Sequence, residues 1–143
     1  MRLMVDHLTK EKRSWNMSRI RSGNTLPEKT VRSVLHRMGF RFRLHRKDLP
    51  GKPDIFIKKR NAVIFVHGCF WHQHPGCKYA TIPKSNIAFW DDKLQGNMRR
   101  DKERIRVLKE QGYNVKTIWE CETKDSEKLA KKLNEFLNDY AGE

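Results

Sequence analysis

Residues 54–67 read DIFIKKRNAVIFVH, and this stretch decides the fold. Two strand-like runs, 54–58 and 62–67, flank the polar turn at residues 59–61, a pattern that predicts an antiparallel β-hairpin. If the turn is centred near Arg60, Asp54 lies directly opposite Val66. The second run is apolar from Ala62 to Val66, which indicates a central strand buried on both faces.

Further helices and strands are predicted on both sides of this hairpin. Thr25-Leu-Pro-Glu28 fits a capping box that opens an amphipathic helix ending at Gly39. Because a helix separates the hairpin from a later strand, that strand should run parallel to residues 62–67 through a right-handed crossover. The chain is therefore predicted to be an α/β sandwich with a mixed sheet. The other expected elements are a half-buried strand at 40–45, an irregular insert at 68–90, a helix at about 92–111, a strand at 115–121 and a helix at about 125–140.

The charge of the chain is strongly positive and unevenly placed. Its net charge is +14, and residues 1–60 hold 17 lysines and arginines against five acidic residues. A nucleic acid explains this crowding best, because each neutralised phosphate releases counterions and adds affinity. We expect residues 1–24 to form a basic N-terminal DNA-binding arm and residues 25–143 to form the folded domain. The chain has neither a secretory signal nor an apolar run of roughly 20 residues, so we expect a cytoplasmic protein with no membrane partner.

The insert and the last strand carry a pattern typical of a structural zinc site. Cys69 and Cys77 flank His72 and His74, and Cys121 follows at the end of the strand at 115–121. Three thiolates and one imidazole complete a tetrahedral zinc site without an open position. Spacing alone does not choose between His72 and His74 as the fourth ligand.

A second candidate metal site lies at the start of the hairpin. Asp54 opens a strand after a Pro- and Gly-rich loop and close to many basic residues. A carboxylate there is a natural ligand for Mg²⁺, which prefers oxygen ligands and retains several waters. A histidine with a pKa near neutrality could accept a proton from an attacking water.

Three motifs make the chain resemble a known family. They are LPGKPD at residues 49–54, VIFVHGCFWH at 63–72 and WEC at 119–121. Together they strongly resemble the very-short-patch repair (Vsr) DNA mismatch endonucleases. The similarity extends from about residue 6 to about residue 138, with further matches at RSWNMS (13–18), TLPEK (25–29), FW (89–90) and NMRRD (97–101).

The resemblance implies a restriction-endonuclease-like three-layer sandwich with a zinc-stapled insert, so that residues 25–143 form the endonuclease domain. It implies Mg²⁺-dependent nicking of one strand, 5′ to the thymine of a T:G mismatch left by deamination of 5-methylcytosine. The expected cofactors are catalytic Mg²⁺ and structural Zn²⁺. The expected partner of the monomer is double-stranded DNA with a T:G mismatch, and mismatch-repair proteins are candidate further partners.

The same resemblance implies roles for individual residues. Asp54 holds Mg²⁺ and His72 is the general base, while His67 and Glu28 support the phosphate and the hydrated metal. Related nucleases carry an acidic residue where this chain has Val66, so the second protein ligand of Mg²⁺ would be the main-chain carbonyl of Val66. The zinc ligands would be Cys69, His74, Cys77 and Cys121.

Aromatic and basic residues are expected to contact DNA. Phe70, Trp71 and Trp90 lie in or beside the insert, where core packing does not demand them, and the resemblance implies that they wedge between base steps. Met17 would approach from the other groove, and cations such as Arg13 and Arg19 would hold phosphates.

Purely structural roles are alternative interpretations of the same residues. Glu28 could merely cap its helix, His67 could be a satisfied histidine at a strand end, and any one of the three aromatics could pack against the zinc loop. Two rival functions are a homodimeric restriction-type endonuclease and a non-catalytic, zinc-stabilised DNA-binding module.

Overall fold

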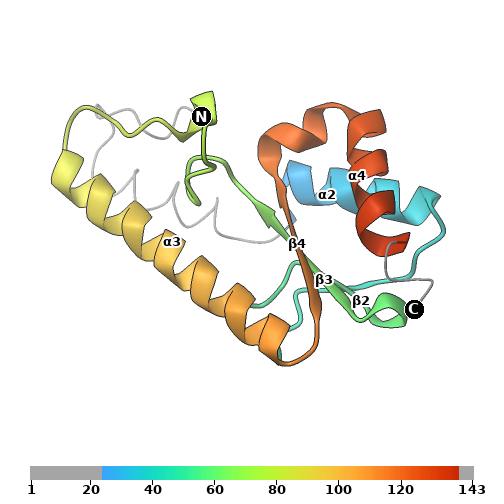
Figure 1. Cartoon of the computed structure of the whole chain (residues 1–143). Helices are drawn as coiled ribbons and strands as arrows, with labels where there is room; N and C mark the ends of the chain where they lie inside the picture. Colours follow the sequence, from blue (N-terminus) through green and yellow to red (C-terminus); the bar gives the residue numbers. More distant parts are fainter. Residues whose placement is uncertain (1–23, 139–143) are drawn as a thin grey trace.

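The computed structural model describes residues 24–138, and these form three layers (Figure 1). A four-stranded sheet in the order β1-β2-β3-β4 is covered by α2 and α4 on one face and by α3 on the other. This confirms the predicted α/β class with a mixed sheet. The elements are α2 (Leu26–Arg37), β1 (Arg43–Leu44), β2 (Ile55–Ile57), η2 (Lys58–Arg60), β3 (Ala62–His67), η3 (Lys78–Ala80), α3 (Ile87–Glu110), β4 (Asn114–Trp119), η4 (Glu120–Lys124) and α4 (Ser126–Asn138).

The sheet is mixed in the way the element order predicts. β2 runs antiparallel to both β1 and β3, while β4 runs parallel to β3 after the crossover through α3. The central position of β3 is confirmed: it pairs on both sides, and every residue except Val66 is buried. The strand expected at 40–45 is shorter than predicted, because only Arg43–Leu44 pairs with β2, and both residues are exposed.

The predicted register of the hairpin is wrong by one residue. Ile55 pairs with Ile64 and Ile57 with Ala62, so the ladder extended by one step places Asp54 opposite Phe65 rather than Val66. The connection is a 3-10 turn closed by Asn61 in the left-handed region, φ 49°, which shifts the register relative to a turn centred at Arg60.

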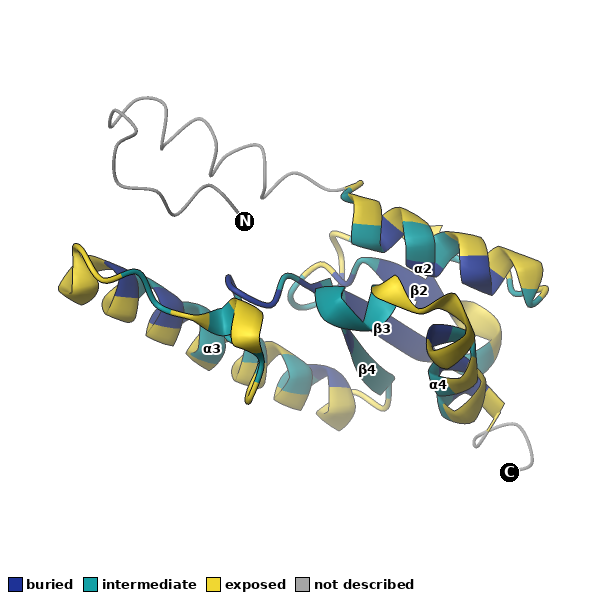
Figure 2. Ribbon diagram, turned by 90° about the horizontal axis from the view of Figure 1, so that it is seen from above, coloured by how far each residue is buried: buried dark blue, intermediate teal, exposed yellow. Residues whose placement is uncertain are grey.

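Apolar side chains of β2 and β3 alternate between two cores. Ile55, Ile57, Ala62 and Ile64 pack with α2 and α4, whereas the side chains between them pack against α3. Burial of both faces makes the hairpin the centre of the molecule, which Figure 2 shows as a dark band between the helical layers. Members of the second core are Leu49, Phe56, Val63, Phe65 and Leu108.

A third cluster lies beyond the sheet, where the first half of α3 meets the insert. Phe70, Trp71, Trp90 and Leu94 pack together and are all buried. The expectation that core packing does not demand these aromatics is therefore wrong: the insert has no strand of its own and uses their rings as its core. Within residues 24–138, no helix is long and apolar enough to cross a membrane.

Candidate active site and metal centres

The sheet topology brings the candidate catalytic residues to one edge. Asp54 precedes β2 and His67 ends β3, and because these strands are antiparallel both residues lie at the same end of the hairpin. A cavity of about 610 Å³ opens there. The cavity is lined, among others, by Glu28, Asp54, Val66, His67, His72 and Asp101.

Asp54 and Glu28 present two carboxyl groups to this cavity. Asp54 Oδ2 accepts the main-chain N–H of Val66 at 2.7 Å, so the carboxyl reaches Val66 despite the shifted register. Burial raises the pKa of Asp54 to about 7; the N–H of Val66 opposes this rise, and the neighbouring Glu28 carboxylate adds to it. A buried carboxyl beside a second carboxyl is the environment that a divalent cation relieves.

Glu28 is held in place by several donors. Its Oε2 accepts hydrogen bonds from the Asn24 N–H and from Arg32 Nη2, each at 3.0 Å, and lies 3.0 Å from His45 Nε2. The predicted capping box is half formed, because Thr25 Oγ1 accepts the Glu28 N–H whereas the Glu28 carboxylate bonds outside the box. The side chain of Glu28 is thus held by Arg32 of its own helix and by neighbouring groups, and it lines the cavity at the same time.

His72 and His67 form a stacked pair in the same cavity. Their ring centroids are 3.8 Å apart and the ring planes differ by 6°. His72 Nδ1 lies 2.6 Å from Asp101 Oδ2, and since a carboxylate can only accept, the proton of the neutral imidazole is assigned to Nδ1, which leaves the lone pair on Nε2. Burial, with a smaller contribution from His72, lowers the pKa of His67 to about 3, so His67 is neutral near neutral pH.

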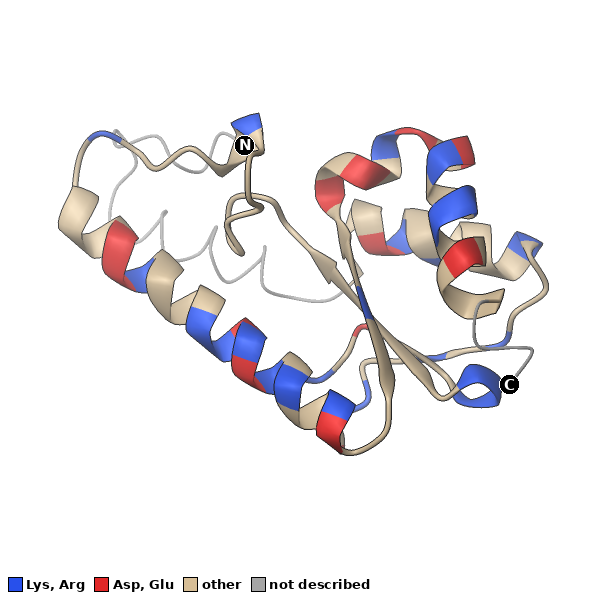
Figure 3. Ribbon diagram, in the orientation of Figure 1, with Lys and Arg blue, Asp and Glu red and all other residues tan. Residues whose placement is uncertain are grey.

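Polar residues of α3 hold the insert against the cavity. Asp101 bonds to His72, and Asn97 Nδ2 donates to the carbonyl of Trp71 at 2.9 Å. Arg100 and Arg104 also line the cavity from this helix. Neither arginine was predicted from the sequence as a site residue, although residues 97, 100, 101 and 104 recur at helical spacing and form one polar face. Figure 3 shows basic residues along this part of α3.

Gly51 of the LPGKPD motif makes room for one of these arginines. Its φ is +76°, a conformation that favours glycine, and a Cβ there would lie 2.8 Å from Arg104 Cδ. The loop before Asp54 therefore packs closely against the stem of Arg104. This contact explains why a glycine stands at the turn.

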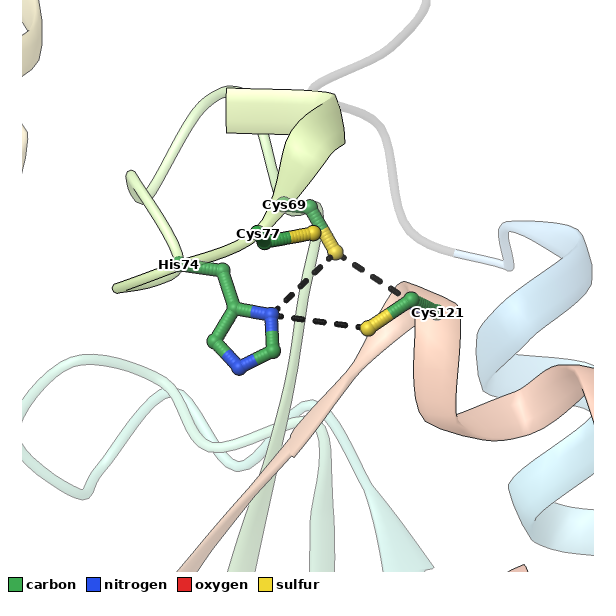
Figure 4. A group of neighbouring side chains, drawn as sticks. All are labelled: Cys69, His74, Cys77 and Cys121. Atoms are coloured by element: carbon green, nitrogen blue, oxygen red, sulfur yellow. Dashed lines mark hydrogen bonds between the residues drawn. The ribbon is translucent and has the colours of Figure 1, made fainter. Parts of the chain in front are cut away.

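The predicted zinc ligands come together in a second cluster (Figure 4). Cys69, His74, Cys77 and Cys121 offer ligand atoms that all lie within 4.8 Å of one another. His74 Nδ1 is 3.4 Å from Cys121 Sγ and 3.8 Å from Cys69 Sγ. Zn–N and Zn–S bonds of about 2.1 and 2.3 Å in a tetrahedron place such atoms about 3.6 Å apart, so the donor set fits zinc.

The parallel pairing of β3 and β4 explains this convergence. His67 pairs with Trp119, and Cys69 and Cys121 each follow their strand by two residues. Cys121 was predicted at the end of the strand, but it lies in η4, just past the end of β4. Of the two candidate histidines, His74 faces the thiols and His72 faces the cavity.

Protonation in this cluster follows its surroundings. Burial raises the pKa of the Cys69 thiol to about 12, whereas the main-chain N–H of Tyr79 lowers the pKa of Cys77. Burial also lowers the pKa of His74, which favours the neutral imidazole that a metal requires. The His74 ring stacks on Trp119 with centroids 4.3 Å apart, which fixes its orientation.

Comparison with known proteins places the chain in a family. The model of the family DNA mismatch endonuclease Vsr matches residues 5–78. The chain belongs to the Vsr family. It is 47% identical over 135 residues to the Type II nicking enzyme V.XorIIP of Xanthomonas oryzae, covering 94% of this chain and 98% of that protein. It is 38% identical over 138 residues to the DNA mismatch endonuclease Vsr of Escherichia coli, covering 96% and 88%.

A solved structure supports the fold. The catalytic domain of the homing endonuclease I-Bth0305I superposes with a TM-score of 0.59 at 22% identity, covering 82% of this chain and 98% of that domain. The restriction-endonuclease-like architecture expected from the motifs is therefore confirmed. As a member of the Vsr family, the chain is a DNA endonuclease.

The predictions for the N-terminal arm concern residues outside those that the structure describes. They comprise the roles of Arg13, Met17 and Arg19 in DNA binding and the DNA-binding arm at residues 1–24. Of that arm, the structure describes only Asn24.

Proposed function

We propose that this Vsr-family protein nicks one DNA strand 5′ to the thymine of a T:G mismatch by Mg²⁺-dependent hydrolysis. The observation that carries the proposal is the single cavity shared by Asp54 and His72, which offers a carboxylate for a metal and an imidazole for a proton. Relatives named as a mismatch endonuclease and as nicking enzymes support the single-strand cut and the mismatch substrate.

Asp54 and Glu28 are the proposed anchors for the catalytic metal. Asp54 would bind Mg²⁺ directly, the main-chain carbonyl of Val66 would be the second protein ligand, and Glu28 would support the metal-bound waters. Their fit to Mg²⁺ rests on the buried carboxyl pair described above, since Mg²⁺ is bound through one or two carboxylates and keeps several waters. When bound, Mg²⁺ supplies charge neutralisation at the scissile phosphate and lowers the pKa of water.

His72 is the proposed general base. Its free Nε2 accepts the proton of the attacking water, while the Asp101 carboxylate stabilises the imidazolium that forms and fixes the ring. The neutral His67 ring, stacked at 3.8 Å, adds no opposing charge when His72 becomes protonated. Asp101 is thus a positioning residue that acts through His72.

Cations around the cavity are proposed to hold the DNA backbone. Lys52, Arg100 and Arg104 line it and are exposed, so phosphates can reach them. Contacts of this kind set the register of the duplex without reading its sequence. Arg13 and Arg19 of the N-terminal arm are proposed to extend the same basic surface.

Mismatch recognition is proposed to use the aromatic cluster of the insert. Phe70, Trp71 and Trp90 are buried, yet Trp71 also lines the cavity, and the exposed Phe89 contacts Trp90 edge-on at 5.1 Å. Unstacking a base costs least beside a mismatch, so an aromatic wedge selects it. Met17 is proposed to enter from the opposite groove.

The proposal is tested with matched and T:G-containing duplexes, each strand labelled separately, with and without Mg²⁺. We expect one cut in one strand of the T:G duplex only. Asp54→Ala and His72→Ala should abolish nicking and keep DNA binding, while His36→Ala, an exposed histidine of α2, should behave as wild type. Cutting of both strands at a palindrome would indicate a restriction-type enzyme, and binding without cutting would indicate a DNA-binding module.

A further inference from the structure

His45 lies next to the proposed metal anchors, although it was not predicted from the sequence as a site residue. It follows β1 with its backbone in the left-handed region, φ 48°. Its main-chain N–H donates to the main-chain carbonyl of Asp54 at 3.1 Å. This bond ties the backbone of His45 to that of Asp54, so the two side chains keep a fixed relation.

The imidazole of His45 completes a three-residue donor set. Glu28, His45 and Asp54 offer ligand atoms that all lie within 4.8 Å of one another. His45 Nε2 is 3.0 Å from Glu28 Oε2. Two neighbouring ligands of an octahedral ion with bonds of about 2.1 Å are separated by about 3.0 Å, so the observed spacing suits a shared cation.

A cation compensates the charge of Glu28, whereas the hydrogen-bond donor to Asp54 is neutral. Arg32 Nη2 bonds to Glu28 at 3.0 Å and compensates the charge of that carboxylate. The Asp54 carboxyl, by contrast, accepts a hydrogen bond from the neutral main-chain N–H of Val66 at 2.7 Å. Glu28 is itself almost fully buried, with 5% exposed, so solvent contributes little to its carboxyl, whereas Asp54 is half-buried.

We propose that the catalytic metal at Asp54 takes His45 Nε2 as a nitrogen ligand, with Glu28 adjacent, and that the site therefore favours Mn²⁺ over Mg²⁺. This inference rests on the proposed metal site at Asp54 and adds its ligand set and its metal preference. Mg²⁺ binds oxygen almost exclusively, whereas imidazole nitrogen suits the transition metals. A site that adds an imidazole nitrogen to the Asp54 carboxylate thus discriminates between the two ions.

The experiment uses full-length protein whose Cys and His cluster has first been saturated with zinc. Mn²⁺ binding is measured by electron paramagnetic resonance, and pulsed spectra report whether a ¹⁴N nucleus is bound to the ion. We expect a ¹⁴N coupling in wild type and in His36→Gln, and none in His45→Gln. His45→Gln should also weaken Mn²⁺ about tenfold while changing Mg²⁺ affinity little, since a ligand or its support is commonly worth that factor or more.

Further variants separate this inference from the proposed function. Asp54→Asn should abolish Mn²⁺ binding, and His72→Gln should retain the ¹⁴N coupling. Mn²⁺ that depends on Asp54 but shows no ¹⁴N coupling, or a coupling that survives in His45→Gln, would overturn the role of His45 and leave the proposed metal site intact. Mn²⁺ binding that is unchanged in Asp54→Asn would overturn both. Thermal unfolding of each variant checks that it folds. If His45→Gln does not fold, the test is made with His72→Gln alone. Loss of the ¹⁴N coupling in that variant would assign the nitrogen ligand to His72 and overturn the role of His45.

Discussion

Replacing Asp54 by Asn should stabilise the Mg²⁺-free protein, and the gain should grow with pH. In the unfolded chain this carboxyl ionises near its ordinary pKa of 3.8, but burial keeps it protonated to about 7 in the folded protein. Between these values the folded state binds more protons than the unfolded state, so wild type loses stability as pH rises through this window. Because the Asn side chain does not ionise, Asp54→Asn does not lose stability through this titration.

The size of the effect follows from the two pKa values. Each pKa unit corresponds to about 1.4 kcal/mol, so the rise from 3.8 to about 7 gives an upper limit of about 4 kcal/mol. Solvent reaches part of the Asp54 side chain, which lowers the expected difference to about 1–3 kcal/mol above pH 7. Near pH 4 the difference should be close to zero, because Asn can still accept the N–H of Val66.

The assay is urea unfolding of zinc-loaded wild type and Asp54→Asn at pH steps from 4.5 to 8, without Mg²⁺. Subtracting the two curves removes the titration of groups common to both proteins. Added Mg²⁺ should then stabilise wild type alone at pH 8. A stability difference that is constant with pH, or that favours wild type at high pH without metal, would refute the argument that burial leaves this carboxyl in need of a cation.

Three further predictions concern the base, the zinc and the aromatic cluster. Asp101→Asn should lower nicking about 10- to 100-fold and leave DNA affinity unchanged, because the Asn side chain can hold the ring but not stabilise its charge; activity equal to wild type in a single-turnover assay would contradict this. Cys77→Ser should reduce zinc content below one equivalent by atomic absorption and lower the melting temperature; full zinc content would argue against this ligand. Trp71→Ala should lower the preference for T:G over matched duplex in competition binding by about tenfold, whereas an unchanged preference would argue against its role as a wedge.

Much of the fold follows from patterns that local chemistry determines. The structure confirms two elements that were predicted from such patterns. The apolar run from Ala62 to Val66 predicted the central strand β3, and Thr25 and Gly39 predicted the two ends of helix α2. The pairing register of β2 and β3 could not be predicted in this way. One residue in the left-handed region, Asn61, shifts the whole ladder, and the alternation of apolar residues does not reveal this shift.

The candidate site was predictable where residues follow strands and was missed where they meet across loops. Asp54 and Cys121 lie at strand ends, and the topology alone brings such positions to one edge. His45 was missed because its place depends on a left-handed backbone in a loop, which its residue type does not signal. The burial of Phe70 and Trp90 was missed because the insert has no regular pattern, so that only the packed structure reveals its core.

The zinc cluster and the active site are coupled through one short loop. His72 and His74 are separated by a single residue, yet one faces the cavity and the other faces the thiols. Two main-chain bonds fix this segment, from the N–H of His72 to the carbonyl of Gly68 at 3.1 Å and from the N–H of His74 to the carbonyl of Cys69 at 2.9 Å. An ion that holds His74 therefore also limits where the general base can lie. Loss of zinc should consequently reduce nicking more than it reduces DNA binding, because the basic residues of α3 do not depend on this loop.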